Sequence, residues 1–162
     1  MYAKILVPVD GSATSTAGLK EAIKIAKSQG SEIRLVHVVD ALILDAGYGA
    51  GIYACDAVEV LRKMGRDILD AAQTSARREG IKTNSVMLES VGGPASDQLL
   101  AEAKAWPADL VVMGTHGRRG LARLVMGSDA EAVVRACPVP VLLVHGAAKR
   151  SAAASRVKAA AI

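Results

Sequence analysis

The sequence predicts an α/β fold built on one doubly wound, five-stranded parallel sheet. Two observations carry this prediction. Apolar runs alternate along the chain with segments whose apolar residues recur at helical spacing, as in chains of repeated strand–helix units. The length of 162 residues fits a single domain with a sizeable core. Apolar residues make up 51% of the chain, but aromatics only 2% and Phe is absent, so the core is expected to be aliphatic.

Five strands are expected where the apolar runs lie. The runs cover residues 3–9, 32–39, 82–90, 108–114 and 141–144. The third run alternates between apolar and polar residues, which predicts a less buried strand. The last run follows Pro138-Val-Pro140, a break that separates it from the preceding helix.

Four helices are expected between these strands, and each has a start or stop signal. Their signals are N-cap candidates from Ser12 to Thr16 with Gly30 at the end of the first, Gly80 after the second (Val58 to Ala76), Gly93-Pro94 as the first residues of the third, and Ser128 at the start of the fourth. Because crossovers between parallel strands are right-handed, the helices are expected to cover both faces of the sheet.

The strand order is the next question, and the patterns leave two orders open. One is 2-1-3-4-5, which is usual for five-stranded doubly wound folds. The other is 3-2-1-4-5, in which the first and fourth strands are neighbours at the switch point. We expect 3-2-1-4-5, because it brings Asp10, after the first strand, to face Gly114, after the fourth. That order accounts for the two polar, glycine-bearing turns that follow these two strands.

The most informative stretch is Gly114-Thr-His-Gly117, followed by Gly127-Ser128. Glycines after a strand allow the backbone to turn with positive φ and to approach a ligand closely. Ser128 then opens a helical pattern, and the N-terminus of a helix suits a phosphate group. The insert between the two turns carries Arg118, Arg119 and Arg123, which either contact phosphate or form a solvated basic loop.

Three polar residues around these turns have two interpretations each. Asp10 either orients Mg²⁺ or a ribose, or forms an Asp-Gly turn before the first helix. Ser128 either binds phosphate or caps its helix, because Ser128-Asp-Ala-Glu131 matches a capping box. Asp129 stabilises the first turn of the helix but repels a phosphate, an effect that Arg118, Arg119 and Arg123 could offset.

Several classes of site are excluded by pattern. No Gly-Lys-Ser/Thr follows the glycines, as a Walker A loop requires, and no Gly-x-Gly-x-x-Gly precedes a helix. No catalytic constellation stands out: His37 is expected to be a core or rim histidine, whereas His116 could touch phosphate or serve as an acid. No apolar run is long enough for a membrane span, and the start of the chain has no signal-peptide pattern, so we expect a cytoplasmic protein without a membrane partner.

The formal net charge of +4 belongs to the end of the chain. Residues 147–162 form an Ala/Ser-rich tail with four basic residues and no acidic one, so residues 1–146 sum to +4 − 4 = 0. We therefore expect one domain over residues 1–146, a flexible tail over 147–162, and no nucleic-acid partner.

The chain resembles the universal stress protein family over about residues 1–146. The resemblance rests on Lys4-Ile-Leu-Val-Pro-Val-Asp-Gly-Ser12, Leu35-Val-His-Val38, Ala108-Asp-Leu-Val-Val-Met-Gly-Thr-His-Gly117, Gly127-Ser128 and Pro138-Val-Pro-Val-Leu-Leu-Val144. The family's ATP-binding branch carries Gly-x2-Gly-x9-Gly-Ser/Thr, and Gly114, Gly117, Gly127 and Ser128 match it without a gap. The implied fold is similar to that of the adenine nucleotide alpha hydrolases.

The resemblance also implies roles for individual residues. Pro8, Val9 and Asp10 correspond to the turn near adenine, ribose and metal, and the backbone of Val38 to the group that reads the adenine edge. Gly114, Thr115, His116 and Gly117 correspond to the ribose and phosphate loop, and Gly127 and Ser128 to the triphosphate contacts. Asp129 is a departure, since the family usually has a small apolar residue there.

The resulting interpretation is a stress-response regulator that binds ATP with Mg²⁺, acts as a nucleotide-dependent switch on an unknown protein partner, and is not a committed enzyme. A homodimer joined through the last strand, Val141 to Val144, is expected as well. Three alternatives stay open. They are a slow ATPase or phosphotransfer enzyme using Asp10-bound Mg²⁺ and His116, a binding module for AMP or a cyclic nucleotide, and an interaction protein whose site stays empty.

Overall fold

The computed structural model describes residues 1–40, 52–116 and 126–145. Its elements follow one another as β1 (Lys4–Pro8), α1 (Ala13–Gln29), β2 (Glu32–Asp40), α2 (Ile52–Arg78), β3 (Thr83–Ser90), α3 (Ala95–Ala105), β4 (Leu110–Gly114), α4 (Ser128–Ala136) and β5 (Val141–Val144). The strands form one parallel sheet in the order β3-β2-β1-β4-β5. The expected α/β class and the expected strand order are confirmed.

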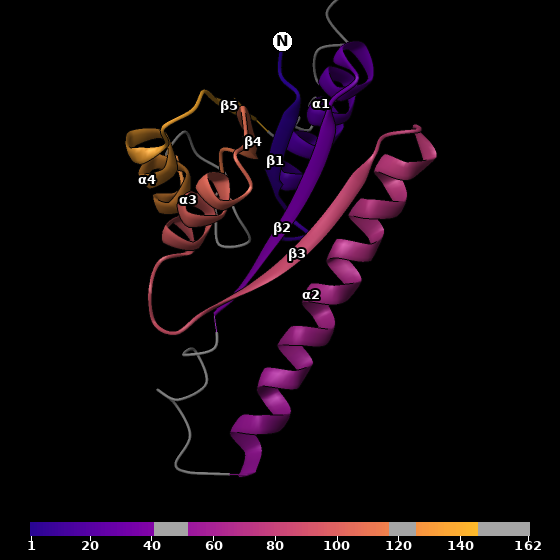
Figure 1. The fold of residues 1–162 in the computed structure, drawn as a ribbon. Coiled ribbons are helices and arrows are strands. Elements are labelled where there is room, and N and C mark those ends of the chain that lie inside the picture. Colours follow the sequence, from indigo (N-terminus) through magenta and orange to yellow (C-terminus); the bar gives the residue numbers. More distant parts are fainter. Residues whose placement is uncertain (41–51, 117–125, 146–162) are drawn as a thin grey trace, which may run out of the picture.

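The helices cover both faces of the sheet, as right-handed crossovers require. Helices α1 and α2 lie on one face, whereas α3 and α4 pack together on the other (Figure 1). The switch point lies between β1 and β4, where the chain passes from one half of the sheet to the other. None of the helices in the described ranges is long and apolar enough to cross a membrane.

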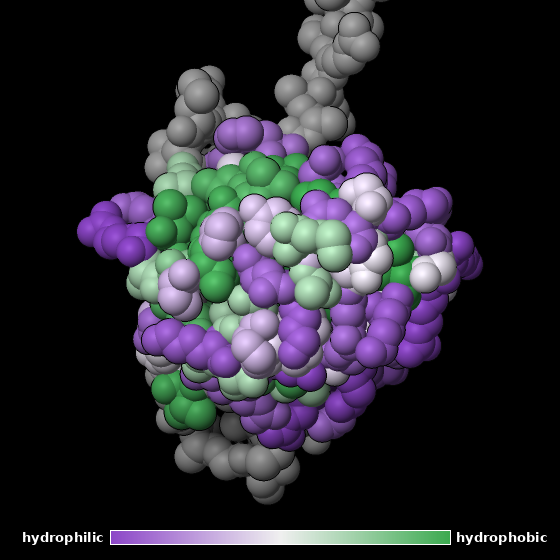
Figure 2. All heavy atoms as spheres, turned by 45° about the horizontal axis from the view of Figure 1, so that its top comes forward, coloured by the Kyte–Doolittle hydropathy of each residue, from purple (hydrophilic) through white to green (hydrophobic). Residues whose placement is uncertain are grey.

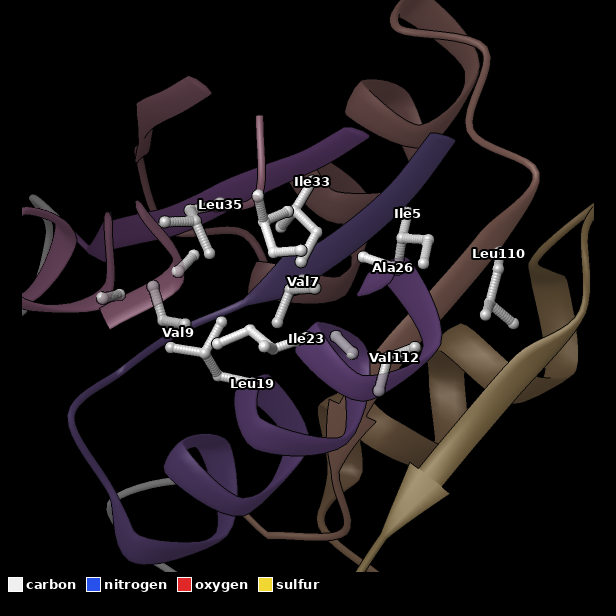
Figure 3. Packing of buried hydrophobic residues seen from close by; sticks show 14 of the residues in the cluster. Ile5, Val7, Val9, Leu19, Ile23, Ala26, Ile33, Leu35, Leu110 and Val112 are labelled. Carbon is white, nitrogen blue, oxygen red and sulfur yellow. The ribbon is translucent and has the colours of Figure 1, made fainter. Parts of the chain in front are cut away.

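The core consists of two aliphatic clusters, one on each face. On the α1 side, buried residues of β1, β2 and β4 such as Val7, Leu35 and Val112 point toward Leu19 and Ile23 of α1 (Figure 3). On the α3 side, Leu6, Val36 and Val111 pack with Leu99, Trp106 and Val133. The central strands are therefore buried on both faces, which explains their continuous apolar sequences.

The remaining strands are less buried. Strand β3 contains one buried residue, Ser90, in agreement with its alternating sequence. On the surface seen in Figure 2, hydrophilic residues lie on the flanks and apolar residues emerge in patches between them.

The helix ends follow the expected signals with two adjustments. The Ser12 hydroxyl caps α1 by accepting the Ser15 N–H, and Gly30 ends the helix with φ of 72°. Gly80 follows α2 with φ of 76°, but α2 begins at Ile52, six residues before the expected start. Pro94 is the N-cap residue of α3 and not its first helical residue.

Candidate functional site

A cavity of about 460 Å³ opens at the carboxyl ends of β1, β2 and β4, beside the switch point. Its wall combines strand ends with the first turns of α3 and α4. The lining residues are Pro8, Val9, Asp10, Ser15, Val36, His37, Val38, Val39, Asp40, Leu61, Ala95, Leu99, Met113, Gly114, His116, Gly127, Ser128, Asp129 and Ala130. In open α/β sheets this is the position where ligands bind.

The cavity gathers most of the residues that the sequence nominated. Nine of them line it: Pro8, Val9, Asp10, Val38, Gly114, His116, Gly127, Ser128 and Asp129. Thr115 lies behind the wall, with 3% of its surface exposed. Gly117, Arg118 and Arg119 lie outside the described residues.

Asp10 forms a tight turn between β1 and α1 while it faces the cavity. Its Oδ1 accepts the Ser12 N–H at 2.9 Å, and Gly11 between them has φ of 80°. This is the Asp-Gly turn that the sequence suggested as one interpretation. Asp10 also lines the cavity, so the turn keeps this residue at the cavity wall, and its role toward a metal or a ribose stays a prediction.

Gly114 is needed for a reason other than the expected one. The expectation of positive φ at Gly114 is wrong: the residue ends β4, and it is not among the glycines with positive φ. Instead it faces α1, where an added Cβ would stand 2.9 Å from the carbonyl oxygen of Thr14. The missing side chain lets the first turn of α1 touch the end of β4. The Thr14 hydroxyl then donates to the carbonyl oxygen of His116.

The start of α4 is also built differently from the capping box. Gly127, and not Ser128, is the N-cap residue, and no side-chain cap bond is present. The reason is a tertiary contact: the Gly127 N–H donates to the Thr115 carbonyl oxygen at 2.9 Å, which sets the start of the helix one residue earlier. The Glu131 carboxylate accepts from Arg135 and does not reach back to the cap.

This construction leaves the first backbone donors of α4 without acceptors inside the helix. The first intrahelical bond runs from the Glu131 N–H to the Gly127 carbonyl oxygen. The N–H groups of Ser128, Asp129 and Ala130 therefore have no acceptor within the helix. All three residues line the cavity, and the positive end of the helix dipole points the same way. Such a helix start suits an anionic group.

Thr115 holds the turns around the cavity together. Its N–H donates to the Val144 carbonyl oxygen at 3.1 Å, and its own carbonyl accepts from Gly127. Its hydroxyl lies 3.0 Å from Nδ1 of His116 and 3.3 Å from Nδ1 of His145. One buried threonine thus links β4, β5, α4 and two imidazoles. Nε2 of His116 is buried and has no hydrogen-bond partner among the residues that the structure describes.

His37 and Asp40 are wall residues that the sequence reasoning did not include. His37 is buried as expected, and its Nδ1 lies 2.7 Å from the Val9 carbonyl oxygen. A carbonyl only accepts, so Nδ1 carries the proton. The Val9 N–H in turn donates to Val36, so the end of β1 is tied twice to β2. Asp40 is the last residue of β2, and Asp10 lies just after β1, so the same rule of polar residues at strand ends would have found Asp40.

Asp129 connects the first turns of α3 and α4. Its Oδ1 accepts the Ser96 N–H at 3.2 Å. Pro94 provides no side-chain cap for α3, so the carboxylate serves as a cap from a neighbouring helix. The described residues contain no group of three or more His, Cys, Asp or Glu side chains that could hold a metal ion.

The fold and the sequence both have known relatives. A universal stress protein of Methanocaldococcus jannaschii, MJ0531, is 37% identical over 144 residues, which is 89% of this chain and 82% of that protein. A crystal structure of a universal stress protein family member from Burkholderia pseudomallei is 31% identical with a TM-score of 0.71, covering 88% and 96% of the two chains. The hypothetical protein MJ0577 shares the fold, with a TM-score of 0.78 at 24% identity, covering 93% and 99%.

Three more distant structural neighbours were solved with nucleotides. A universal stress protein in complex with cAMP is 24% identical with a TM-score of 0.61, covering 90% of this chain and 98% of its own. One from Archaeoglobus fulgidus in complex with dAMP is 24% identical with a TM-score of 0.63, covering 88% and 98%. An Arabidopsis thaliana family protein with AMP bound is 17% identical with a TM-score of 0.62, covering 91% and 94%. These likenesses show the shared fold.

The family itself is shown by a match along the described domain. The profile of the Universal stress protein family matches residues 1–145, so the match includes every strand of the sheet and every described residue of the cavity wall. On this match and on the 37% identity to MJ0531, the chain belongs to the universal stress protein family.

Proposed function

We propose that this protein binds ATP as its Mg²⁺ complex in the cavity beside the switch point, and that nucleotide occupancy switches its contact with a partner protein during a cytoplasmic stress response. One observation carries the proposal. The open helix start at Ser128, Asp129 and Ala130 and the carboxylate of Asp10 line the same cavity, which pairs an anion-binding group with a metal-binding one.

The shape and chemistry of the cavity support an adenine nucleotide. Val9, Val38 and Leu99 are apolar residues that line the cavity, and such residues suit a purine base. The polar part, at the start of α4, suits phosphates. A cavity of about 460 Å³ is of the size that ligands of this class occupy. The AMP, dAMP and cAMP bound by structural neighbours support the same ligand class.

The metal would come to the site with the phosphates. Asp10 is the residue proposed to hold Mg²⁺, and a carboxylate oxygen is the donor that this ion prefers. When bound, Mg²⁺ would neutralise phosphate charge. Meanwhile the Ser12 N–H keeps the Asp10 carboxylate oriented through its bond to Oδ1. On the sequence pattern alone, we assign Gly117, Arg118 and Arg119 to the phosphates as well.

The enzyme alternative draws on one specific observation. His116 lines the cavity, and its buried Nε2 has no hydrogen-bond partner among the described residues, so this ring is the candidate acid or base once a movement exposes the nitrogen to a bound phosphate. Its neighbour, the Thr115 hydroxyl, is not a candidate nucleophile, because Thr115 is buried and does not line the cavity. A steady-state phosphate-release assay separates the two functions. We expect turnover well below about 1 per second, the lower end of ordinary enzymes.

The nucleotide itself is tested on the full-length protein. Native mass spectrometry of the protein as purified should reveal a carried nucleotide by its mass. Isothermal titration of nucleotide-free protein should show heat with ATP and Mg²⁺. Binding of AMP or a cyclic nucleotide in place of ATP would favour the alternative binding module. No heat and no thermal shift with any adenine nucleotide at millimolar concentration would reject the proposal.

A further inference from the structure

The described wall of the cavity is acidic. It contains the carboxylates of Asp10, Asp40 and Asp129, and none of its described residues is a lysine or arginine. The N-terminus of α4 adds only a partial positive charge. A metal-free phosphate chain is repelled by each of these carboxylates, and the arginines assigned above to the phosphates, Arg118 and Arg119, lie outside the described residues.

Asp129 is the carboxylate nearest to the proposed phosphate donors in the sequence, since its own N–H is one of them. It lies in the first turn of α4, and its bond to the Ser96 N–H keeps the carboxylate at the junction of α3 and α4. Ser96 is 1% exposed, so its amide is a fixed anchor. A carboxylate in the first turn of a helix interacts with the same dipole that a phosphate would use.

From this arrangement, which rests on the function proposed above, we infer that Asp129 is a specificity-determining residue. It makes the site accept a phosphate chain whose charge is neutralised by a divalent cation, and reject the same chain without the metal. Both helix starts remain intact in this scheme. The Asp129 carboxylate stabilises α3 and α4, and its negative charge lowers the affinity of the site for the metal-free ligand.

The test measures ATP affinity by titration calorimetry, with Mg²⁺ and with EDTA, on nucleotide-free full-length protein. Asp129→Asn keeps an acceptor oxygen for the Ser96 N–H and removes the charge. We expect the wild-type protein to bind ATP much more tightly with Mg²⁺. In Asp129→Asn the affinity for metal-free ATP should rise on the order of tenfold, with a smaller rise for the Mg²⁺ complex. The ratio of the two affinities should therefore shrink.

Glu131→Gln is the matched control. Glu131 lies in the same helical turn, but its carboxylate pairs with Arg135 at 2.7 Å and does not line the cavity. Its removal should leave the Mg²⁺ ratio as in the wild type. Circular dichroism of both variants shows that they are folded.

A second measurement compares the salt dependence of the two proteins. Because salt screens the repulsion between Asp129 and the phosphates, raising the salt concentration should reduce the difference in metal-free ATP affinity between the wild type and Asp129→Asn. Equal Mg²⁺ ratios in the wild type and Asp129→Asn, or an affinity difference that does not shrink with salt, would overturn the inference and leave the proposed function standing. Absence of any adenine-nucleotide binding, by contrast, would reject the proposed function and the inference with it.

Discussion

Gly114 at the end of β4 lies so close to Thr14 in α1 that a β-carbon on Gly114 would stand 2.7 Å from the Thr14 carbonyl carbon. The contact is reciprocal along the helix: a β-carbon on Gly18, one turn later, would lie 3.3 Å from the Gly114 nitrogen. Two glycines thus bring α1 onto the strand end that forms the cavity wall. The first glycine of the family pattern serves this packing, in addition to any contact with a ligand.

The first prediction follows from this contact. Gly114→Ala should destabilise the protein by about 1–3 kcal/mol, because the added methyl meets backbone atoms that no change of rotamer can move. Urea denaturation measures the loss. Gly93→Ala is the control, since the atom nearest to an added Cβ there is 3.6 Å away and the change should be nearly neutral. Equal stability of the two variants would contradict the packing role.

The pattern of the chain was sufficient to predict the fold class and the strand positions, because apolar periodicity reports directly on which faces are buried. The pattern left two strand orders open, and the observed one was expected only because it brings together the polar turns after the first and fourth strands. The missed details depend on tertiary contacts. The helix after Gly127 is capped through Thr115, twelve residues earlier, and not by its own serine. The cavity role of His37 depends on which face of β2 its ring occupies and on the nearby backbone of α2, neither of which a local pattern specifies.

The second prediction concerns that space beside His37. A β-carbon on Gly65 of α2 would lie 2.7 Å from Cδ2 of His37 and 3.0 Å from Sδ of Met87. Gly→Ala inside a helix normally stabilises by about 1 kcal/mol, but here the clash should outweigh that gain and leave Gly65→Ala destabilised by roughly 1 kcal/mol. Urea denaturation of a double-mutant cycle checks the cause. In a His37→Ala background, where the ring is absent, Gly65→Ala should become neutral or stabilising.

Additive effects of Gly65→Ala and His37→Ala would contradict this interpretation. They would mean that the methyl meets something other than the imidazole. A strongly non-additive result would show that the glycine exists to admit the ring, and with it the bond from His37 to Val9 beside the cavity.

The third prediction is a pH dependence at the contact between α2 and β3. Arg62 donates to both carboxylate oxygens of Glu89, at 2.7 and 3.1 Å. These hydrogen bonds hold the pKa of Glu89 below its ordinary value of 4.5. A carboxylate whose pKa is lowered in the folded state adds stability above its unfolded pKa and loses it as the pH falls through the folded pKa. The coupling between the two residues should thus be present at neutral pH and vanish in acid, below 4.5.

A double-mutant cycle with Arg62→Ala and Glu89→Gln gives the coupling free energy between the two residues. It is measured by thermal unfolding at neutral pH and again in acid, below 4.5. The side chains are exposed, so the coupling should be small and should weaken with salt. Arg62→Lys is the control, because it keeps the positive charge but cannot form the bidentate hydrogen bonds to Glu89. It should retain only part of the coupling free energy. A coupling that persists in acid would show that the pair acts by packing and not by charge.

The last prediction concerns the proposed dimer. Strand β5 is at the edge of the sheet, and it pairs with β4 on one side. The Val111 N–H of β4 donates to the Pro140 carbonyl oxygen, so the backbone of residue 140 faces β4. Backbone groups alternate in direction along a strand paired on one side, so the N–H of Val141 faces outward. An outward row of donors with partly exposed apolar side chains is a pairing edge unless it is covered.

Val141→Pro removes one outward donor and leaves the bonds between β4 and β5 in place, so it should weaken the dimer without unfolding the subunit. Light scattering at micromolar concentration should give a dimer for the wild type and a monomer for the variant, with unchanged circular dichroism. Val91→Ala changes an exposed apolar residue just beyond the opposite edge strand, β3, and should leave the dimer intact. A monomeric wild type would exclude β5 as the interface. A Val141→Pro variant that stays fully dimeric would exclude it as well, because this variant lacks the outward backbone donor that pairing through β5 requires.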